Sequence, residues 1–178
     1  MKPENRKILL GTALYLLCMS GVTAQPKSAG TSFSINGIEA SYEHFIDSES
    51  FIEVNMKAEC ADMFFGRSTY PGASASVIWN MIIGERKSCN GNTLRFFAGP
   101  GLMVGWGSDL MRPPGLLAGL KGRIGAECEY DRNVTISISV SPTIGTHTLI
   151  FEEYTEMRYY RAGLISAVLP VIGIKYTF

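Results

Sequence analysis

The sequence has few of the features that mark helical membrane proteins, disulfide scaffolds or metal sites. Beyond residue 24, the longest uncharged stretch near the end runs from Ala162 to Ile174 and contains Pro170 and two glycines. A spanning helix needs about 20 apolar residues, more than this stretch holds, so a helical membrane protein is disfavoured. Only two histidines occur, and the formal net charge is zero. With no basic patch, no nucleic-acid partner is expected.

Cysteines are also sparse, and their pattern favours no special chemistry. Three remain after residue 24, at Cys60, Cys89 and Cys128. An odd number in an exported chain argues against a disulfide framework. No C-x-x-C or Cys/His spacing indicates a metal site, so we interpret the three as small apolar residues and expect no metal and no cofactor.

The start of the chain, up to Ala24, has the pattern of a cleavable signal peptide. Positive residues come first, at Lys2, Arg6 and Lys7, and a short apolar stretch follows at 8–19. Val22-Thr23-Ala24 places small residues where signal peptidase cuts. A lipoprotein signal at Cys18 is the rival, but Leu17 stands where a small residue is needed. We therefore expect residues 1–24 to be a signal peptide and residues 25–178 to be one domain.

Residues 51–60 give the clearest sign of a β-strand. Apolar and polar side chains alternate with a period of two, which sorts them onto opposite faces of a strand. A helix would scatter them around its surface. One face holds Ile52, Val54, Met56, Ala58 and Cys60, and the other holds Glu53, Asn55, Lys57 and Glu59.

The longest alternating segment is residues 116–130, and it predicts half of a long hairpin. A short polar turn at 131–133 leads into residues 134–144, where Val and Ile alternate with Thr and Ser. Two long strands joined by so few residues are typical of a β-hairpin. The polar face of the first strand holds Lys121, Arg123, Glu127 and Glu129.

Weaker alternation predicts further strands at 32–43, 73–85 and 93–106, and an apolar tract covers the end of the chain from Tyr159. The alternation slips at Asn36-Gly37, which we interpret as a local irregularity within one strand. Pro100 predicts a bulge or bend. Loops are expected at 45–50, 62–72, 86–92, 107–115 and 150–157, where glycine, proline, serine or acidic residues gather.

Alternation alone does not separate a membrane barrel from a soluble one, but strand length favours the membrane. Among the clear segments, 51–60 is the shortest and 116–130 is the longest, so each is at least as long as a short spanning strand. A tilted spanning strand needs about 9–11 residues, whereas soluble strands are nearer about 5 or 6. Unlike charges on the polar face would pair inside the filled lumen of a small barrel. The residues expected to line that lumen are Glu53, Lys57, Glu59, Lys121, Arg123, Glu127, Glu129 and Lys175.

Aromatic residues near the ends of the segments resemble the girdles that membrane barrels carry at both interfaces. The last strand alternates apolar residues up to Phe178. The residues interpreted as girdle positions are Phe33, Tyr42, Phe51, Trp106, Tyr130, Tyr159, Tyr160, Tyr176 and Phe178.

Together, the signal peptide, the Phe-Ala-Gly-Pro-Gly tract at 97–101 and the C-terminal pattern resemble the small bacterial outer-membrane β-barrel superfamily of the OmpA/OmpX type. The resemblance implies an all-β fold, an antiparallel up-and-down transmembrane barrel in the outer membrane. It also implies that Ile174, Tyr176 and Phe178 form a C-terminal signal for the barrel-assembly machinery. Seven segments are clear, and closed bacterial barrels have an even number of strands, so we expect eight.

The expected function is that of a non-enzymatic outer-membrane protein with a structural or surface-interaction role. Balanced lumen charges predict a plugged interior rather than a wide pore. The expected partners are outer-membrane lipid and, during biogenesis, the assembly machinery, and the expected state is a monomer.

Two alternatives remain open on the sequence. A soluble periplasmic, lipocalin-like binder would carry its apolar face inward around a ligand. A lipid-modifying barrel enzyme would use His147, which stands between Thr146 and Thr148 with Glu152 and Glu153 nearby. These are suitable groups for nucleophilic catalysis, but no serine adjoins the histidine. His44 stands alone beside a loop, so no catalytic residue is predicted.

Overall fold

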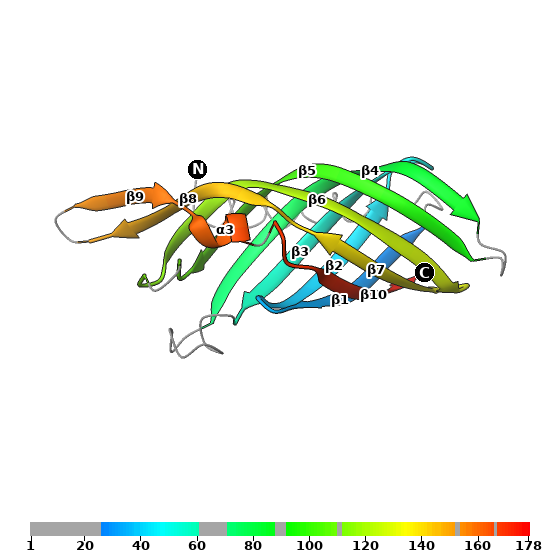
Figure 1. Cartoon of the computed structure of the whole chain (residues 1–178), viewed down its shortest axis with the longest axis horizontal. Helices are drawn as coiled ribbons and strands as arrows, with labels where there is room; N and C mark the ends of the chain where they lie inside the picture. Colours follow the sequence, from blue (N-terminus) through cyan, green and yellow to red (C-terminus); the bar gives the residue numbers. More distant parts are fainter. Residues whose placement is uncertain (1–25, 61–70, 88–91, 110–111, 152–153, 166) are drawn as a thin grey trace, which may run out of the picture.

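The chain forms a closed antiparallel β-barrel (Figure 1). The computed structural model describes residues 26–60, 71–87, 92–109, 112–151, 154–165 and 167–178. The expected signal peptide therefore lies outside the described residues. The described elements are β1 (Lys27–Ser34), β2 (Gly37–Phe45), β3 (Ser50–Glu59), β4 (Gly72–Lys87), β5 (Thr93–Gly107), β6 (Gly115–Asp131), β7 (Val134–Val140), β8 (Thr143–Ile150), β9 (Thr155–Tyr159), α3 (Arg161–Ile165) and β10 (Val171–Thr177).

Ten described strands occupy eight strand positions around the barrel, because two of these positions are each made from two shorter strands. The order is β5-β4-β3-β2-β1-β10-β7-β6-β8-β9, and a β5–β6 pairing closes the ring. The long strand β6 pairs with β7 along one half and with β8 along the other, so β7 and β8 together occupy one strand position. β9 and β10, separated by α3, form the last one. The expectation of eight strands is confirmed.

The eighth strand comes from residues 32–43, where the sequence predicts one irregular strand and the structure has parts of two. The prediction of one strand there is wrong. β1 and β2 form a hairpin around the tight turn at 35–36, with Ser34 opposite Gly37. Gly37 has a φ of 146°, a region that residues with a Cβ rarely adopt. A Cβ there would also lie 1.9 Å from the carbonyl oxygen of Ala58. The Asn36-Gly37 pair is thus a turn signal, not a slip within a strand.

Four other predictions about single elements are also wrong. The segment 134–144 is broken at 141–142 between β7 and β8, since Pro142 has no N–H to donate to a ladder. Residues 161–165 are helical rather than extended, and β9 occupies part of the predicted loop 150–157. β5 runs through Pro100 without interruption, and the register shift lies instead in β4, between Ile82 and Gly84.

The two ends of the barrel differ in the connections they carry. Both described termini lie at one end, where Lys27 and Phe178 exchange backbone hydrogen bonds of 3.2 and 2.8 Å. We call this the terminal end; the connections at 46–49, 88–92 and 132–133 lie there too. The connections at 60–71, 108–114 and 151–154 lie at the other end, here called the loop end, together with the short β1–β2 turn at 35–36. No helix in the described parts of the chain is long and apolar enough to cross a membrane.

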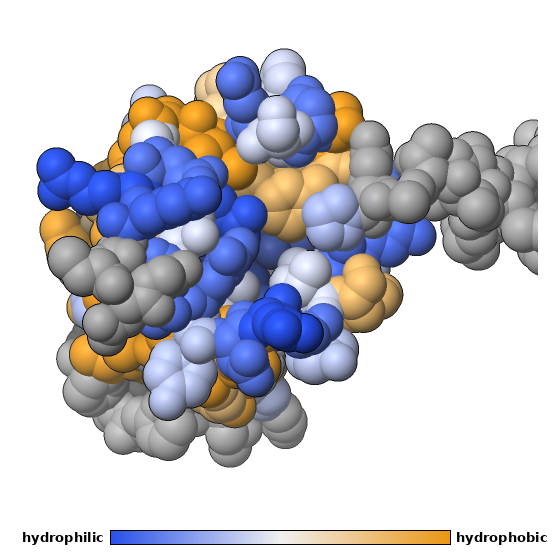
Figure 2. Space-filling model, turned by 90° about the vertical axis from the view of Figure 1, so that its right-hand side faces the viewer, coloured by the Kyte–Doolittle hydropathy of each residue, from blue (hydrophilic) through white to orange (hydrophobic). Residues whose placement is uncertain are grey.

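The side chains have the reverse of the distribution in a soluble protein. Large apolar residues on most strands point outward and are about half exposed, among them Ile38, Val54, Leu120, Ile138 and Ile174. Polar and charged residues fill the interior. Figure 2, which faces the terminal end, shows hydrophilic residues across that end and hydrophobic residues on the flank. A surface of this kind fits hydrocarbon on the outside.

Candidate functional site

The centre of the lumen holds a network of ion pairs around Arg123 of β6. Its Nη1 lies 2.9 Å from Oε1 of Glu39 and 2.5 Å from Oε1 of Glu53. Lys121 Nζ donates to Glu39 Oε2 and to Ser76 Oγ, both at 3.1 Å. Arg123 is 1% exposed and Glu53 is 0% exposed. The network therefore joins three strands, β2, β3 and β6, through charges that water does not screen.

A second group of ion pairs surrounds Lys175 of β10. Its Nζ donates to Glu43 of β2 and lies 3.3 Å from Oε2 of Glu127 on β6. Arg95 of β5 in turn contacts Glu127 at 3.0 Å and Glu129 at 2.9 Å. Four buried carboxylates (Glu39, Glu43, Glu53, Glu127) thus meet four cations (Arg95, Lys121, Arg123, Lys175), so the charges within these two groups of ion pairs balance.

Three buried phenylalanine rings lie on the terminal side of these ion pairs. Phe45, Phe51 and Phe97 form one buried cluster, with ring centroids 5.1 Å apart for the first two and 5.7 Å for the last two. The ammonium of Lys175 lies 5.5 Å from the Phe97 centroid, a cation–π distance. Placing Phe51 in an outer girdle was therefore wrong. Phe51 lies two residues before Glu53 on β3, so the two side chains share one face of the strand, and both point inward.

A second layer of packed side chains lies towards the loop end. The hydroxyl of Tyr160 donates to Oε2 of Glu59, the last residue of β3, at 3.2 Å. The ring of Tyr160 packs with Met103 and Leu117. Tyr160 is 6% exposed, so its assignment to an outer girdle was also wrong. This layer follows from the break between β9 and β10, which turns the chain inward at residue 160.

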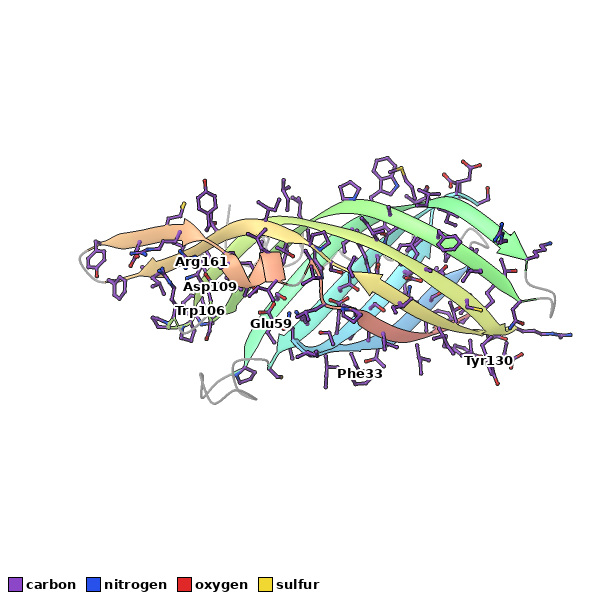
Figure 3. All side chains as sticks on the ribbon, viewed as in Figure 1. Phe33, Glu59, Trp106, Asp109, Tyr130 and Arg161 are labelled. Carbon is purple, nitrogen blue, oxygen red and sulfur yellow. The ribbon has the colours of Figure 1, made fainter. Side chains whose placement is uncertain are left out.

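Asp109 holds the start of α3 against the end of β5. Its carboxylate accepts hydrogen bonds from the backbone amides of Arg161 at 3.2 Å and Ala162 at 2.8 Å. Asp109 is 1% exposed, and Figure 3 shows it next to Arg161 at the end of the barrel away from Tyr130. A carboxylate on the first amides of a helix is a stabilising cap. This contact pins α3 to the barrel wall.

His147 lies inside the loop-end layer, not on an open rim. Its Nε2 is 3.2 Å from the carbonyl oxygen of Gly107. Its Nδ1 is buried and has no hydrogen-bond partner among the described residues. The described parts of the chain place no hydroxyl or carboxylate against this ring at hydrogen-bond distance, and they hold no cluster of metal-ligating residues. Glu152 and Glu153 lie outside the described residues.

The structure places the eight residues expected in the lumen at different depths. Glu53, Lys121, Arg123, Glu127 and Lys175 are 5% exposed or less. The side chains of Lys57 and Glu59 are 16% and 17% exposed, with 3.8 Å between Nζ and Oε1. The side chain of Glu129 is 42% exposed, at the terminal end of β6. Ile174, Tyr176 and Phe178, the expected assembly signal, are all more than half exposed.

Sequence reasoning missed several interior residues. Glu39 and Glu43 are two of the four buried carboxylates in the ion-pair groups. The prediction of one strand over the segment that holds them, instead of a hairpin, left them out. Asn80 Nδ2 donates to Glu53 Oε2 at 2.9 Å, from a segment whose two faces are both partly apolar. The alternation of Glu39, Ser41 and Glu43 was the signal that could have found the first two.

Comparison with known proteins gives a fold and no close relative. No protein-family model matches the chain, and no curated protein matches its sequence. The N-terminal β-barrel domain of OprF from Pseudomonas aeruginosa superposes with a TM-score of 0.53 at 10% identity, covering 86% of this chain and 96% of that domain. The chain has the fold of a small outer-membrane β-barrel. Apolar side chains outside and paired charges inside agree with that fold, and they indicate the outer membrane as the location.

Two further barrels match less closely. Neisserial surface protein A gives a TM-score of 0.43 at 11% identity, covering 86% of this chain and 94% of that one. Ail, the attachment invasion locus protein of Yersinia pestis, gives 0.36 at 10% identity, covering 86% and 95%. The assignment of the fold rests on the OprF domain and on the strand pairing of this chain. The lipocalin-like alternative is wrong for the described barrel, because it requires an apolar interior.

Proposed function

We propose that this protein is an integral outer-membrane barrel with a closed lumen, and that its role is structural or one of surface interaction rather than catalysis. The observation that carries the proposal is the filled interior. Ion pairs cross the centre of the lumen, the three phenylalanines lie on one side of them, and the Tyr160–Glu59 layer lies on the other. An interior occupied by paired side chains offers no continuous path for solutes.

The two ends of the barrel support an orientation. Bacterial outer-membrane barrels carry short turns on the periplasmic side and longer loops outside. The two longest connections, 60–71 and 108–114, belong to the loop end. We therefore propose that the loop end faces the exterior and that the terminal end faces the periplasm. The outward-facing Ile174, Tyr176 and Phe178 of the last strand remain the proposed signal for the assembly machinery.

The environment of His147 supports a non-enzymatic role. A general base in hydrolysis needs a nucleophile within hydrogen-bond reach and an opening to the substrate. The ring is 1% exposed and contacts a backbone carbonyl. This arrangement favours a packing residue of the loop-end layer.

Electrical recording tests the closed lumen. Purified full-length barrel inserted in a planar lipid bilayer in concentrated KCl is expected to give no discrete current steps above the bilayer baseline. Insertion is checked separately by the shift between heated and unheated samples in gel electrophoresis. Regular single-channel steps from the folded protein would overturn the proposal. A denatured sample and a known porin serve as controls.

A further inference from the structure

β9 leaves one hydrogen-bonding edge open in a sheet that is otherwise closed. The strand order ends on β9, which pairs with β8 alone among the described strands, whereas β5 at the other end of the order pairs with β6. An unpaired row of N–H and C=O groups is a template for another strand. Closed barrels normally remove such edges, and lipid offers these groups no hydrogen-bond partner.

The side chains beside this edge are uncovered as well. Tyr159 is 81% exposed and Met157 is 66% exposed, and the side chain of Arg158 is 55% exposed. In Figure 1 the β8–β9 hairpin extends beyond the barrel body at the end away from the C-terminus. No described element of the chain pairs with this edge of β9.

The sequence of β9 is complementary to itself. Within one chain Glu156 already contacts Arg158, and it lies 3.8 Å from Arg112. If two copies pair antiparallel around Met157, Glu156 also stands opposite Arg158 of the second copy, and this happens twice. Opposite charges directly across an antiparallel pair are stabilising. Moving the register by one pair in either direction would instead place Glu156 opposite itself or Arg158 opposite itself. One register is therefore favoured and its two neighbours are disfavoured by like charges.

We propose that β9 is a homodimerisation edge, at which two copies pair antiparallel through residues 155–159 with Met157 on the two-fold axis. The β8–β9 hairpins then form one four-stranded sheet that spans both barrels. The interface is isologous, as a two-fold axis requires. This replaces the expectation of a monomer. It does not rest on the closed lumen, so its failure would leave the proposed function unaffected.

Disulfide cross-linking tests the register directly. In full-length protein whose own cysteines are replaced by alanine, Met157→Cys is expected to form a dimer under mild oxidation, because residues on the axis face each other at about 4.5–5.5 Å between Cβ atoms. Thr155→Cys and Tyr159→Cys are expected to cross-link when mixed, and much less when each is oxidised alone. Ile150→Cys, which is 68% exposed on β8 and off the axis, is the matched control.

Charge exchange tests the same pairing without cysteine. Glu156→Arg is expected to shift the protein from dimer to monomer in detergent, measured by light scattering, because it places like charges across the edge. The double variant Glu156→Arg/Arg158→Glu restores the opposite charges and is expected to restore the dimer. Heat-modifiable gel migration confirms that each variant is folded. A wild type that stays monomeric, or a Met157→Cys that cross-links only to another envelope protein, would overturn the proposal.

Discussion

Arg123→Ala is expected to destabilise the folded barrel by about 3–5 kcal/mol, the usual cost of removing one partner from a buried ion pair. The guanidinium contacts Glu39 and Glu53 and also donates from Nε to Ser139 at 3.2 Å. Without it, Glu39 keeps its contact with Lys121, whereas Glu53 keeps only the neutral amide of Asn80 among its described side-chain contacts. The measurement is the free energy of unfolding in urea, followed by tryptophan fluorescence of the refolded barrel in lipid vesicles.

Two comparison variants show whether the loss comes from uncompensated charge. Lys57→Ala removes a partly exposed side chain, 3.8 Å from Glu59, and is expected to cost less than about 1 kcal/mol. Arg123→Met combined with Glu53→Gln removes one charge of each sign and leaves the Lys121–Glu39 pair in place. This variant is expected to recover much of the stability, since buried ion pairs seldom outperform neutral packing. A loss below about 1 kcal/mol for Arg123→Ala would show that the network does not stabilise the barrel.

Val54→Arg is expected to cost about 2–4 kcal/mol in lipid, the value for an arginine near the middle of a bilayer. Val54 lies near the middle of β3 and points outward, with 42% of its surface exposed. Folding efficiency into vesicles and the urea midpoint both report the effect. The reason is the surroundings: hydrocarbon cannot solvate a guanidinium, whereas water can.

The same substitution at the end of a strand provides the matched control. Tyr130 lies at the terminal end of β6, is 71% exposed and points away from the barrel (Figure 3). Tyr130→Arg is expected to cost about 0–1 kcal/mol, because charges near the interface are tolerated. Equal costs at both positions would contradict a bilayer with a defined depth around this barrel.

The faces of regular strands could be predicted from the sequence because each one depends only on a local period of two. In β3 the exposed Val54 and the buried Glu53 lie on the sides that the alternation predicts. The orientation of a whole face, towards lipid or lumen, came from strand length and charge rather than from the alternation. Which side chains meet inside the barrel was harder to predict from the sequence, since the ion pairs join residues as far apart in the chain as Glu43 and Lys175.

The breaks between strands were harder to predict because they depend on single residues. Gly37 closes a tight turn through its backbone conformation, and the slip in the alternation at this point does not by itself distinguish a chain reversal from an irregularity within one strand. Phe51 and Tyr160 resembled girdle residues by type, but their place in the pleat or after a break turns them inward. Helix α3 depends on Asp109, which is 52 residues from its first partner in the chain.

Quenching of the two native tryptophans by brominated lipids tests most directly whether the apolar outer face lies in the membrane. Trp79 and Trp106 both point outward and are 54% and 51% exposed. In vesicles of lipids brominated along the acyl chain, the fluorescence of the folded barrel is expected to fall strongly, while acrylamide added to the water has little effect. Strong quenching by acrylamide with no response to bromine would show that the outer face meets water, and would contradict a membrane barrel.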